Sequence, residues 1–189
     1  MSVDLERSLR AYAELLIRIG LDLQPGQRLL ITEPYDNQGV SLESAPLVRV
    51  ITEVAYKHGA RFVDVIWADS ALHGIRQVHA PRDSFAEFSD WKAKAIHMAA
   101  ERGDALLFLL SSEPGSQDPK AAHNAQVVRR TAWQHFGPTA ELLTRGSTNW
   151  CAAPVASTPW AAIVFADAPE SERLGLLWKS IFDACRLDQ

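Results

Sequence analysis

The chain has 189 residues, of which 47% are hydrophobic and 22% are charged. This composition excludes a disordered polypeptide, and a chain of this length can bury about 70% of its unfolded surface in one core. The net charge is -4, from 19 Lys and Arg against 23 Asp and Glu, and no segment carries a dense basic stripe. We therefore expect no nucleic-acid partner.

The sequence also predicts a cytoplasmic protein without a membrane partner. The apolar run over 11–19 is interrupted by Glu14 and Arg18, so it has neither the length of a membrane span nor the layout of a signal peptide. The two cysteines, Cys151 and Cys185, lie far apart and form no CxxC motif. We expect both to be free, buried thiols in a reducing compartment.

Helical and strand patterns alternate along the chain. In chain order they predict a helix over 4–19, a strand over 28–33, a helix over 44–59 with Ser44 as its cap, a strand over 62–67, helices over 69–79 and 84–102, and a strand over 105–110. They continue with a helix over 119–145 that breaks at Gly137-Pro138, a weaker strand over 148–156, and helices over 158–165 and 171–187.

This order predicts an α/β fold, with a mostly parallel sheet of about four to five strands and helices on both faces. The unbroken apolar run over 105–110 is typical of a central strand covered on both sides. We expect the strands over 28–33 and 62–67 to flank it. Pro154 restricts the weaker strand to an edge of the sheet or to its own end.

Ligands of open parallel sheets bind beyond the carboxyl ends of the strands. In this sequence those ends would gather Glu33, Tyr35, Asp69, Ser111, Ser112 and Glu113. The carboxylates of Glu33, Asp69 and Glu113 could together hold Mg²⁺. The alternative is that they are helix caps and solvated loop ends, which is the more common role of acidic residues in such places.

Other chemical motifs are weak or absent. Asp69 and His73 form the one histidine pair with usable ligand spacing, and the sequence contains no HExxH, phosphate-binding loop or GxSxG elbow. We therefore assign no catalytic, cofactor-binding or metal-binding residue from motifs. Six tryptophans exceed the needs of one core, so some are expected on a partner surface, whereas Trp67 and Trp91 are expected to be buried.

Five segments carry a resemblance to a known family. They are YAELLIRIGLDLQPGQRLLI at 12–31, APLVRVITEVAYKHGARFVDVIW at 45–67, Asn149-Trp150, TPWAAIVF at 158–165 and LWKSIFDACRLD at 177–188. In these segments the chain resembles the N-terminal half of the metal-dependent aminopeptidases of the aminopeptidase T, AmpS and PepS type. The similarity extends over nearly the whole chain, in order and spacing, and includes no catalytic signature.

The resemblance implies that residues 1–189 are a single α/β domain, the N-terminal half of an enzyme that removes N-terminal residues from peptides. In that family a following catalytic half binds two divalent metal ions, of the Zn or Co type, through Glu, His, Asp and Tyr. We expect that half to be absent from this chain, which stops at Gln189, so no metal ligand is carried over. The implied partners are the catalytic domain, a second subunit of a homodimer, and peptide substrate.

Two alternatives remain open. The chain could be a free-standing module that binds a small ligand or a protein at the strand carboxyl ends. It could also be a Mg²⁺-dependent enzyme that uses Glu33, Asp69 and Glu113. A reading frame that continues past Gln189 would favour the aminopeptidase domain, and metal analysis of the purified chain would separate the Mg²⁺-dependent enzyme from the other two hypotheses.

Overall fold

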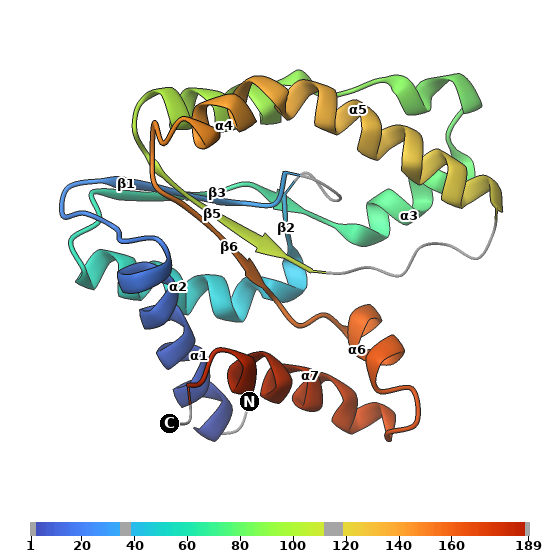
Figure 1. Cartoon of the computed structure of the whole chain (residues 1–189). Coiled ribbons are helices and arrows are strands. Elements are labelled where there is room, and N and C mark those ends of the chain that lie inside the picture. Colours follow the sequence, from blue (N-terminus) through green and yellow to red (C-terminus); the bar gives the residue numbers. More distant parts are fainter. Residues whose placement is uncertain (1–2, 35–38, 112–118, 188–189) are drawn as a thin grey trace.

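A four-stranded parallel sheet forms the centre of the molecule (Figure 1). The computed structural model describes residues 3–34, 39–111 and 119–187. The strands, in spatial order, are β3 (Phe62–Val65), β1 (Arg28–Thr32), β5 (Ala105–Leu110) and β6 (Trp150–Pro154). The predicted α/β class and the parallel sheet are therefore confirmed.

Helices cover both faces of this sheet. In the view of Figure 1, the lower layer contains α1 (Val3–Leu15), its π-helical extension η1 (Leu16–Gly20), α2 (Ala45–Lys57), α6 (Thr158–Val164) and α7 (Glu170–Ala184). The upper layer contains α4 (Asp90–Glu101) and α5 (Pro119–Thr144), and α5 is joined at one end by α3 (Ser70–His79) and η3 (Arg82–Ala86).

Alternate side chains of the two inner strands fill two separate cores. On β1, Leu29 and Ile31 point into the lower core, whereas Leu30 points into the upper one. On β5, Leu107 lies in the lower core and Phe108 in the upper core. Because both faces of these strands are covered, interior positions can be apolar on both sides, and β5 is an unbroken hydrophobic run.

The interior position of β5 and its pairing with β1 agree with the prediction, but the expected pairing with the 62–67 strand was wrong. β5 lies between β1 and β6, and β3 lies beyond β1 at the edge of the sheet. The 62–67 run cannot reach β5 because β1 already occupies that side. The edge position of β6, which ends at Pro154, confirms the prediction made from that proline.

The predicted strand over 62–67 is divided. β3 ends at Val65, and Trp67–Ala68 form β4, which pairs with β2 (Val40–Ser41) in a small second sheet. The backbones approach closely there, because a Cβ on Gly39 would lie 2.7 Å from the carbonyl carbon of Trp67. A short strand, β2, thus lies between β1 and α2.

Several helix boundaries also differ from the predictions. The 84–102 helix begins only at Asp90, after η3, and Ser44 precedes α2 without a side-chain capping bond. α5 continues through Pro138 instead of breaking there. The proline removes one backbone donor, while Phe136 and Leu143 on either side are buried in the upper core, which holds the helix together.

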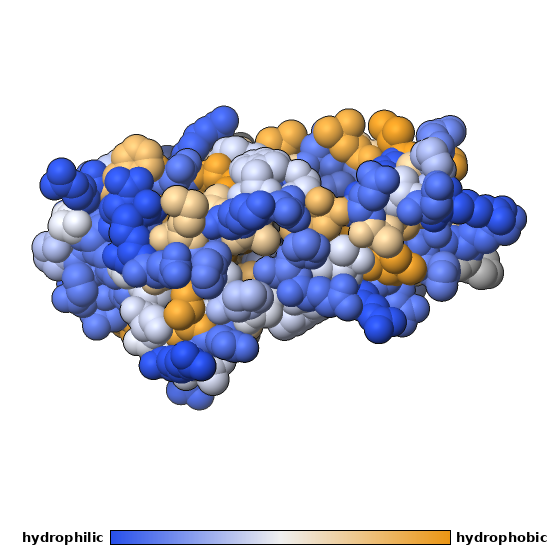
Figure 2. Space-filling model, turned by 90° about the horizontal axis from the view of Figure 1, so that it is seen from above, coloured by the Kyte–Doolittle hydropathy of each residue, from blue (hydrophilic) through white to orange (hydrophobic). Residues whose placement is uncertain are grey.

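α3 has an unusual orientation for an amphipathic helix. Leu72, Ile75 and Val78 are 62%, 55% and 72% exposed, and α3 has no buried residue. Its polar side faces the protein, where Arg76 donates to the carbonyl oxygen of Ser84 at 2.8 Å. In Figure 2, hydrophobic side chains gather along the upper margin toward the end of the molecule where Figure 1 places α3. The apolar side of α3 is therefore a surface feature.

Candidate functional site

The structure places the predicted site residues in different settings. Glu33 is 3% exposed and Ser111 is also buried, both directly after inner strands. Asp69 caps α3, because its Oδ1 accepts a hydrogen bond from the amide of Ala71 at 2.9 Å. The capping alternative therefore holds for Asp69. The remaining predicted residues, Tyr35, Ser112 and Glu113, lie outside the described residues.

Glu33 lies at the topological switch point of the sheet. The chain passes from β1 to β3 on one side, while β5 and β6 lie on the other, so this point is at the carboxyl ends of β1 and β5. Thr32 is fully buried there, and its hydroxyl has no hydrogen-bond partner among the residues that the structure describes. Ligands of open α/β sheets bind at such a point. The polar residues Thr32, Glu33 and Ser111 therefore lie at the end of the sheet where a ligand is expected.

Lys92 is a cation beside this group that no sequence motif indicated. Burial lowers the pKa of Lys92 on α4, and the negative charge of Glu33 acts in the opposite direction. Lys92 follows Trp91 in an ordinary helical pattern, and nothing near it in the sequence points to Glu33. The described residues contain no group of three or more His, Cys, Asp or Glu side chains that could hold a metal ion.

A groove runs along the edge strand β3, from Phe62 at the start of the strand to Trp67 just past its end. It has a volume of about 430 Å³ and is walled by Phe62, Trp67, Trp91 and Met98. Trp67 is 37% exposed and Trp91 is 58% exposed, so the predicted burial of both was wrong. Both tryptophans line the groove, which β3 and β4 border on one side and α4 on the other.

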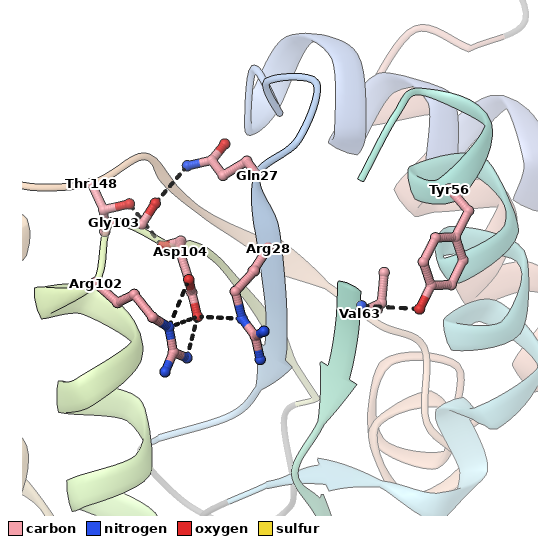
Figure 3. A network of polar contacts seen from close by, with 8 residues as sticks. All are labelled: Gln27, Arg28, Tyr56, Val63, Arg102, Gly103, Asp104 and Thr148. Carbon is pink, nitrogen blue, oxygen red and sulfur yellow. Dashed lines mark hydrogen bonds and ion pairs between the residues drawn. The ribbon is translucent and has the colours of Figure 1, made fainter. Parts of the chain in front are cut away.

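A buried carboxylate joins two arginines at this groove (Figure 3). The Asp104 side chain is only 6% exposed, and both of its oxygens accept hydrogen bonds from Arg102 Nε at 3.1 Å. Arg28 Nε lies 3.5 Å from Asp104 Oδ2. The hydrogen bond to Asp104 raises the pKa of Arg102. These three side chains, which we call the arginine triad, carry a net charge of +1.

Further hydrogen bonds fix the backbone around the arginine triad. Gln27 Nε2 donates to the carbonyl oxygen of Gly103 at 2.9 Å, and the Thr148 hydroxyl donates to that of Asp104 at 2.7 Å. These bonds connect the starts of β1 and β5 with the segment before β6. The position of Asp104 is therefore determined by three strands.

The two cysteines remain free. Cys151 and Cys185 are each partly buried, and burial raises the pKa of both thiols. A raised pKa keeps a thiol protonated and weakly nucleophilic at neutral pH. Neither cysteine has the electrostatic setting of a reactive nucleophile.

The fold is a parallel α/β sheet covered by helices, with a buried polar group at the carboxyl ends of β1 and β5 and a groove along the edge strand β3. A sequence comparison identifies the family. Residues 5–189 match the peptidase M29 family, which is described as thermophilic metalloprotease. The chain belongs to the peptidase M29 family, a family of metallopeptidases. The predicted resemblance to the aminopeptidase T, AmpS and PepS type is confirmed.

Individual relatives extend this finding. Aminopeptidase 2 of Geobacillus stearothermophilus is 35% identical over 187 residues, and aminopeptidase T of Thermus thermophilus is 34% identical over 187 residues. Each alignment covers 97% of this chain and 43% of the relative. The solved structure of wild-type AmpT from Thermus thermophilus superposes with a TM-score of 0.83 at 31% identity, covering 94% of this chain and 43% of that one. The chain thus spans less than half the length of these relatives and corresponds to an N-terminal part of them.

The described helices include none that combines the length and the apolar character required to cross a membrane.

Proposed function

We propose that residues 1–189 form one domain that serves as the non-catalytic N-terminal domain of a metal-dependent aminopeptidase. The enzyme as a whole would remove N-terminal residues from peptides in the cytoplasm. The observation that carries this proposal is the pattern of coverage. Almost all of this chain aligns with aminopeptidase T of Thermus thermophilus, but the alignment covers only 43% of that protein. The aligned part contains a four-stranded sheet and two hydrophobic cores, which supports a role as one domain.

The metal chemistry of the family belongs, in this proposal, to a catalytic half outside residues 1–189. The described residues do not fit a two-metal centre, because no three His, Cys, Asp or Glu side chains gather in one place. A metal-bound water becomes a nucleophile only where ligands fix the ion. We therefore derive no catalytic step on this chain, and assign two divalent ions of the Zn or Co type to the catalytic half.

The role of this domain would be to wall the active-site cavity and to support a homodimer. The outward apolar side of α3 supports this role, because Leu72, Ile75 and Val78 form a stripe that would be covered in a larger assembly. Its partners would be the catalytic domain and a second subunit, with peptide as the substrate of the enzyme.

Activity measurements test the proposal directly. The purified chain, supplied with Co²⁺ or Zn²⁺, is expected not to hydrolyse an aminoacyl p-nitroanilide, because it would lack a metal centre. Turnover that follows the protein through size-exclusion chromatography would contradict the proposal.

A reconstitution experiment tests the domain role. The chain is mixed with a separately expressed C-terminal part of aminopeptidase T from Thermus thermophilus, and the two are expected to elute together. Ile75→Ser on α3 is expected to weaken this association. Ile163→Ser on α6 is the matched control, because Ile163 is 56% exposed on another helix. Equal loss in both variants would argue against a role for α3.

A second candidate is a free-standing module that binds a ligand at the switch point. The burial of Thr32, Glu33 and Ser111 at that point favours it. The genomic reading frame distinguishes the two candidates, because only the aminopeptidase domain requires a catalytic half encoded after Gln189.

A further inference from the structure

The groove beside β3 has the composition of a ligand site. Its walls are aromatic and thioether side chains, Phe62, Trp67, Trp91 and Met98, and its volume of about 430 Å³ lies within the usual range for small-molecule sites, roughly 300–1,000 Å³. A few polar groups set among such walls usually determine which ligand binds. In this groove the polar groups come from the arginine triad.

Arg28 offers its terminal nitrogens to the groove. Its Nε faces Asp104, and its guanidinium carbon lies 4.5 Å from the ring centroid of Phe62. Figure 3 shows the two terminal nitrogens on the side of the guanidinium that faces away from Asp104. Asp104 and Phe62 thus hold the guanidinium in one orientation, while its outer edge remains available to an anion. A planar guanidinium fixed in this way binds a carboxylate through two parallel hydrogen bonds.

The edge of β3 itself is closed to an added strand. Ile66 donates its amide to Ile31 of β1, and alternate amides of a strand point to opposite edges, so the amides of Val63 and Val65 point outward. Both are bound by side chains. The Val63 amide donates to the Tyr56 hydroxyl at 3.1 Å, and the Val65 amide donates to Asp64 Oδ1 at 2.9 Å. Because these two amides are already bonded, the β3 edge does not favour the addition of a peptide strand. We therefore consider a ligand that binds in the groove instead.

We propose that this groove binds a carboxylate with an aromatic or large apolar body. The carboxylate would lie on the terminal nitrogens of Arg28, and the apolar body between Trp67, Trp91 and Met98. Two groups dictate this chemistry. The guanidinium of Arg28 favours an anion at its outer edge, and the aromatic walls favour a flat hydrophobic group. Asp64 also lines the groove, two residues beyond Phe62 on β3, so the charges of Arg28, Arg102, Asp64 and Asp104 sum to zero. The attraction is therefore local to Arg28, which favours a ligand with one negative charge over one with several.

Two sources would supply this chemistry: a free aromatic amino acid or its derivative, and the C-terminal residue of a peptide. Both present a carboxylate next to a large side chain. N-acetyl-phenylalanine represents the free compound, and the tripeptide Gly-Gly-Phe represents the peptide terminus. Tighter binding of either probe identifies the source, and either result supports the site.

The experiment compares N-acetyl-phenylalanine with N-acetyl-phenylalanine amide, which lacks the negative charge. Binding to the full chain is measured by calorimetry, and the site is mapped by NMR from the indole N–H signals of the tryptophans. We expect the acid to bind at least about tenfold more tightly than the amide, the usual value of a charge-assisted pair. The indole signals of Trp67 and Trp91 should shift, whereas that of Trp150, on the opposite edge strand, should not.

Variants separate the site from non-specific binding. Arg28→Gln is expected to reduce the ratio of acid to amide affinity to about one, and Arg145→Gln, at the end of α5, is the matched control that should preserve the ratio. Trp91→Ala is expected to weaken both probes about threefold or more. Trp91 is 58% exposed and is not part of the triad, so this variant tests the site even where Arg28→Gln fails to fold. Trp133→Ala on α5 is its control.

Three results would overturn the proposal: equal affinity for acid and amide in the unmodified chain, no saturable binding up to about 10 mM, or indole shifts confined to tryptophans outside the groove.

Discussion

The Tyr12 hydroxyl donates a hydrogen bond to the carbonyl oxygen of Pro154 at 2.9 Å, so a residue of the first helix is bonded to the end of the last strand. Tyr12 is 1% exposed, and its ring meets those of Trp178 and Phe182 edge to face. Burial raises the pKa of Tyr12, so the hydroxyl remains a donor at ordinary pH. One side chain therefore joins α1, β6 and α7.

Removal of the hydroxyl in Tyr12→Phe leaves the carbonyl oxygen of Pro154 without this partner. We expect the free energy of unfolding to fall by about 1–2 kcal/mol, measured by urea denaturation. Tyr56→Phe is the control, because the Tyr56 hydroxyl also makes a hydrogen bond to the backbone, accepting from the Val63 amide, but Tyr56 is 47% exposed. Its loss should cost less than about 0.5 kcal/mol. Equal losses of stability in the two variants would contradict the prediction that the buried hydrogen bond of Tyr12 contributes more than the exposed one of Tyr56.

Trp178 is the second residue of this aromatic group. It is 8% exposed and stacks on Phe182 with ring centroids 5.4 Å apart. Trp178→Ala should cost about 3–5 kcal/mol, a large share of the total of about 5–15 kcal/mol. Leu174→Ala on the same helix should cost less than about 1 kcal/mol, because Leu174 is 38% exposed. A small effect of Trp178→Ala would mean that α7 is not held by the chain's own core.

Asn149 connects the start of β6 with the segment before β1. Its Nδ2 donates to the carbonyl oxygens of Leu21 at 2.7 Å and Asp22 at 3.0 Å. Asn149→Asp replaces this donor with an acceptor that faces two other acceptors, so we expect a loss of about 1–3 kcal/mol in thermal or chemical unfolding. Asn124→Asp is the comparison, because Asn124 makes one long bond of 3.4 Å to Gln77, and its effect should be smaller. A larger effect at Asn124 would refute the ranking.

We expect the ion pairs of Glu53 to make the stability of the fold depend on pH. Hydrogen bonds from Arg10 and Lys57 lower the pKa of Glu53 from its ordinary 4.5 to about 2. Because the folded pKa is the lower one, this stabilisation is present above pH 4.5 and is lost as the pH falls toward 2. The urea midpoint should therefore fall less steeply over this range in Glu53→Gln than in the unmodified chain.

The pairs of Glu53 are solvent-accessible, so the effect should shrink at high salt. Glu141→Gln, which removes a loose pair with Arg145 at 3.7 Å, should leave the slope nearly unchanged. Identical slopes for Glu53→Gln and the unmodified chain would contradict the prediction.

Local sequence patterns predicted the helices and strands better than they predicted the order of the strands in the sheet. The bounds of β5 match the apolar run of 105–110, because a strand buried on both faces leaves an unbroken signal. The order of β1 and β3 could not be predicted, because both runs are short and rich in apolar residues, and neither run determines which side of the sheet its strand takes. The exposure of Trp67 and Trp91 depends on what covers β3, which is a property of the assembled layers.

The candidate sites divide in the same way. Glu33 and Ser111 could be placed at the strand ends, because every parallel sheet gathers those positions. Arg102 and Asp104 stand close together in the sequence, but Arg28 joins them only through the pairing of β1 with β5. Lys92 approaches Glu33 only through the packing of α4 on the sheet.

The side chains of Tyr56 and Asp64, which accept hydrogen bonds from the outer amides of β3, also affect how the protein aggregates in concentrated solution. At the other margin of the sheet, Pro154 brings a residue without a backbone donor to the end of β6. Neither margin therefore offers a full row of free amides on which a strand from another molecule could be templated. We expect the folded protein to resist fibril growth under agitation, and Tyr56→Phe combined with Asp64→Ala to shorten the lag time of thioflavin-positive aggregation without unfolding the chain.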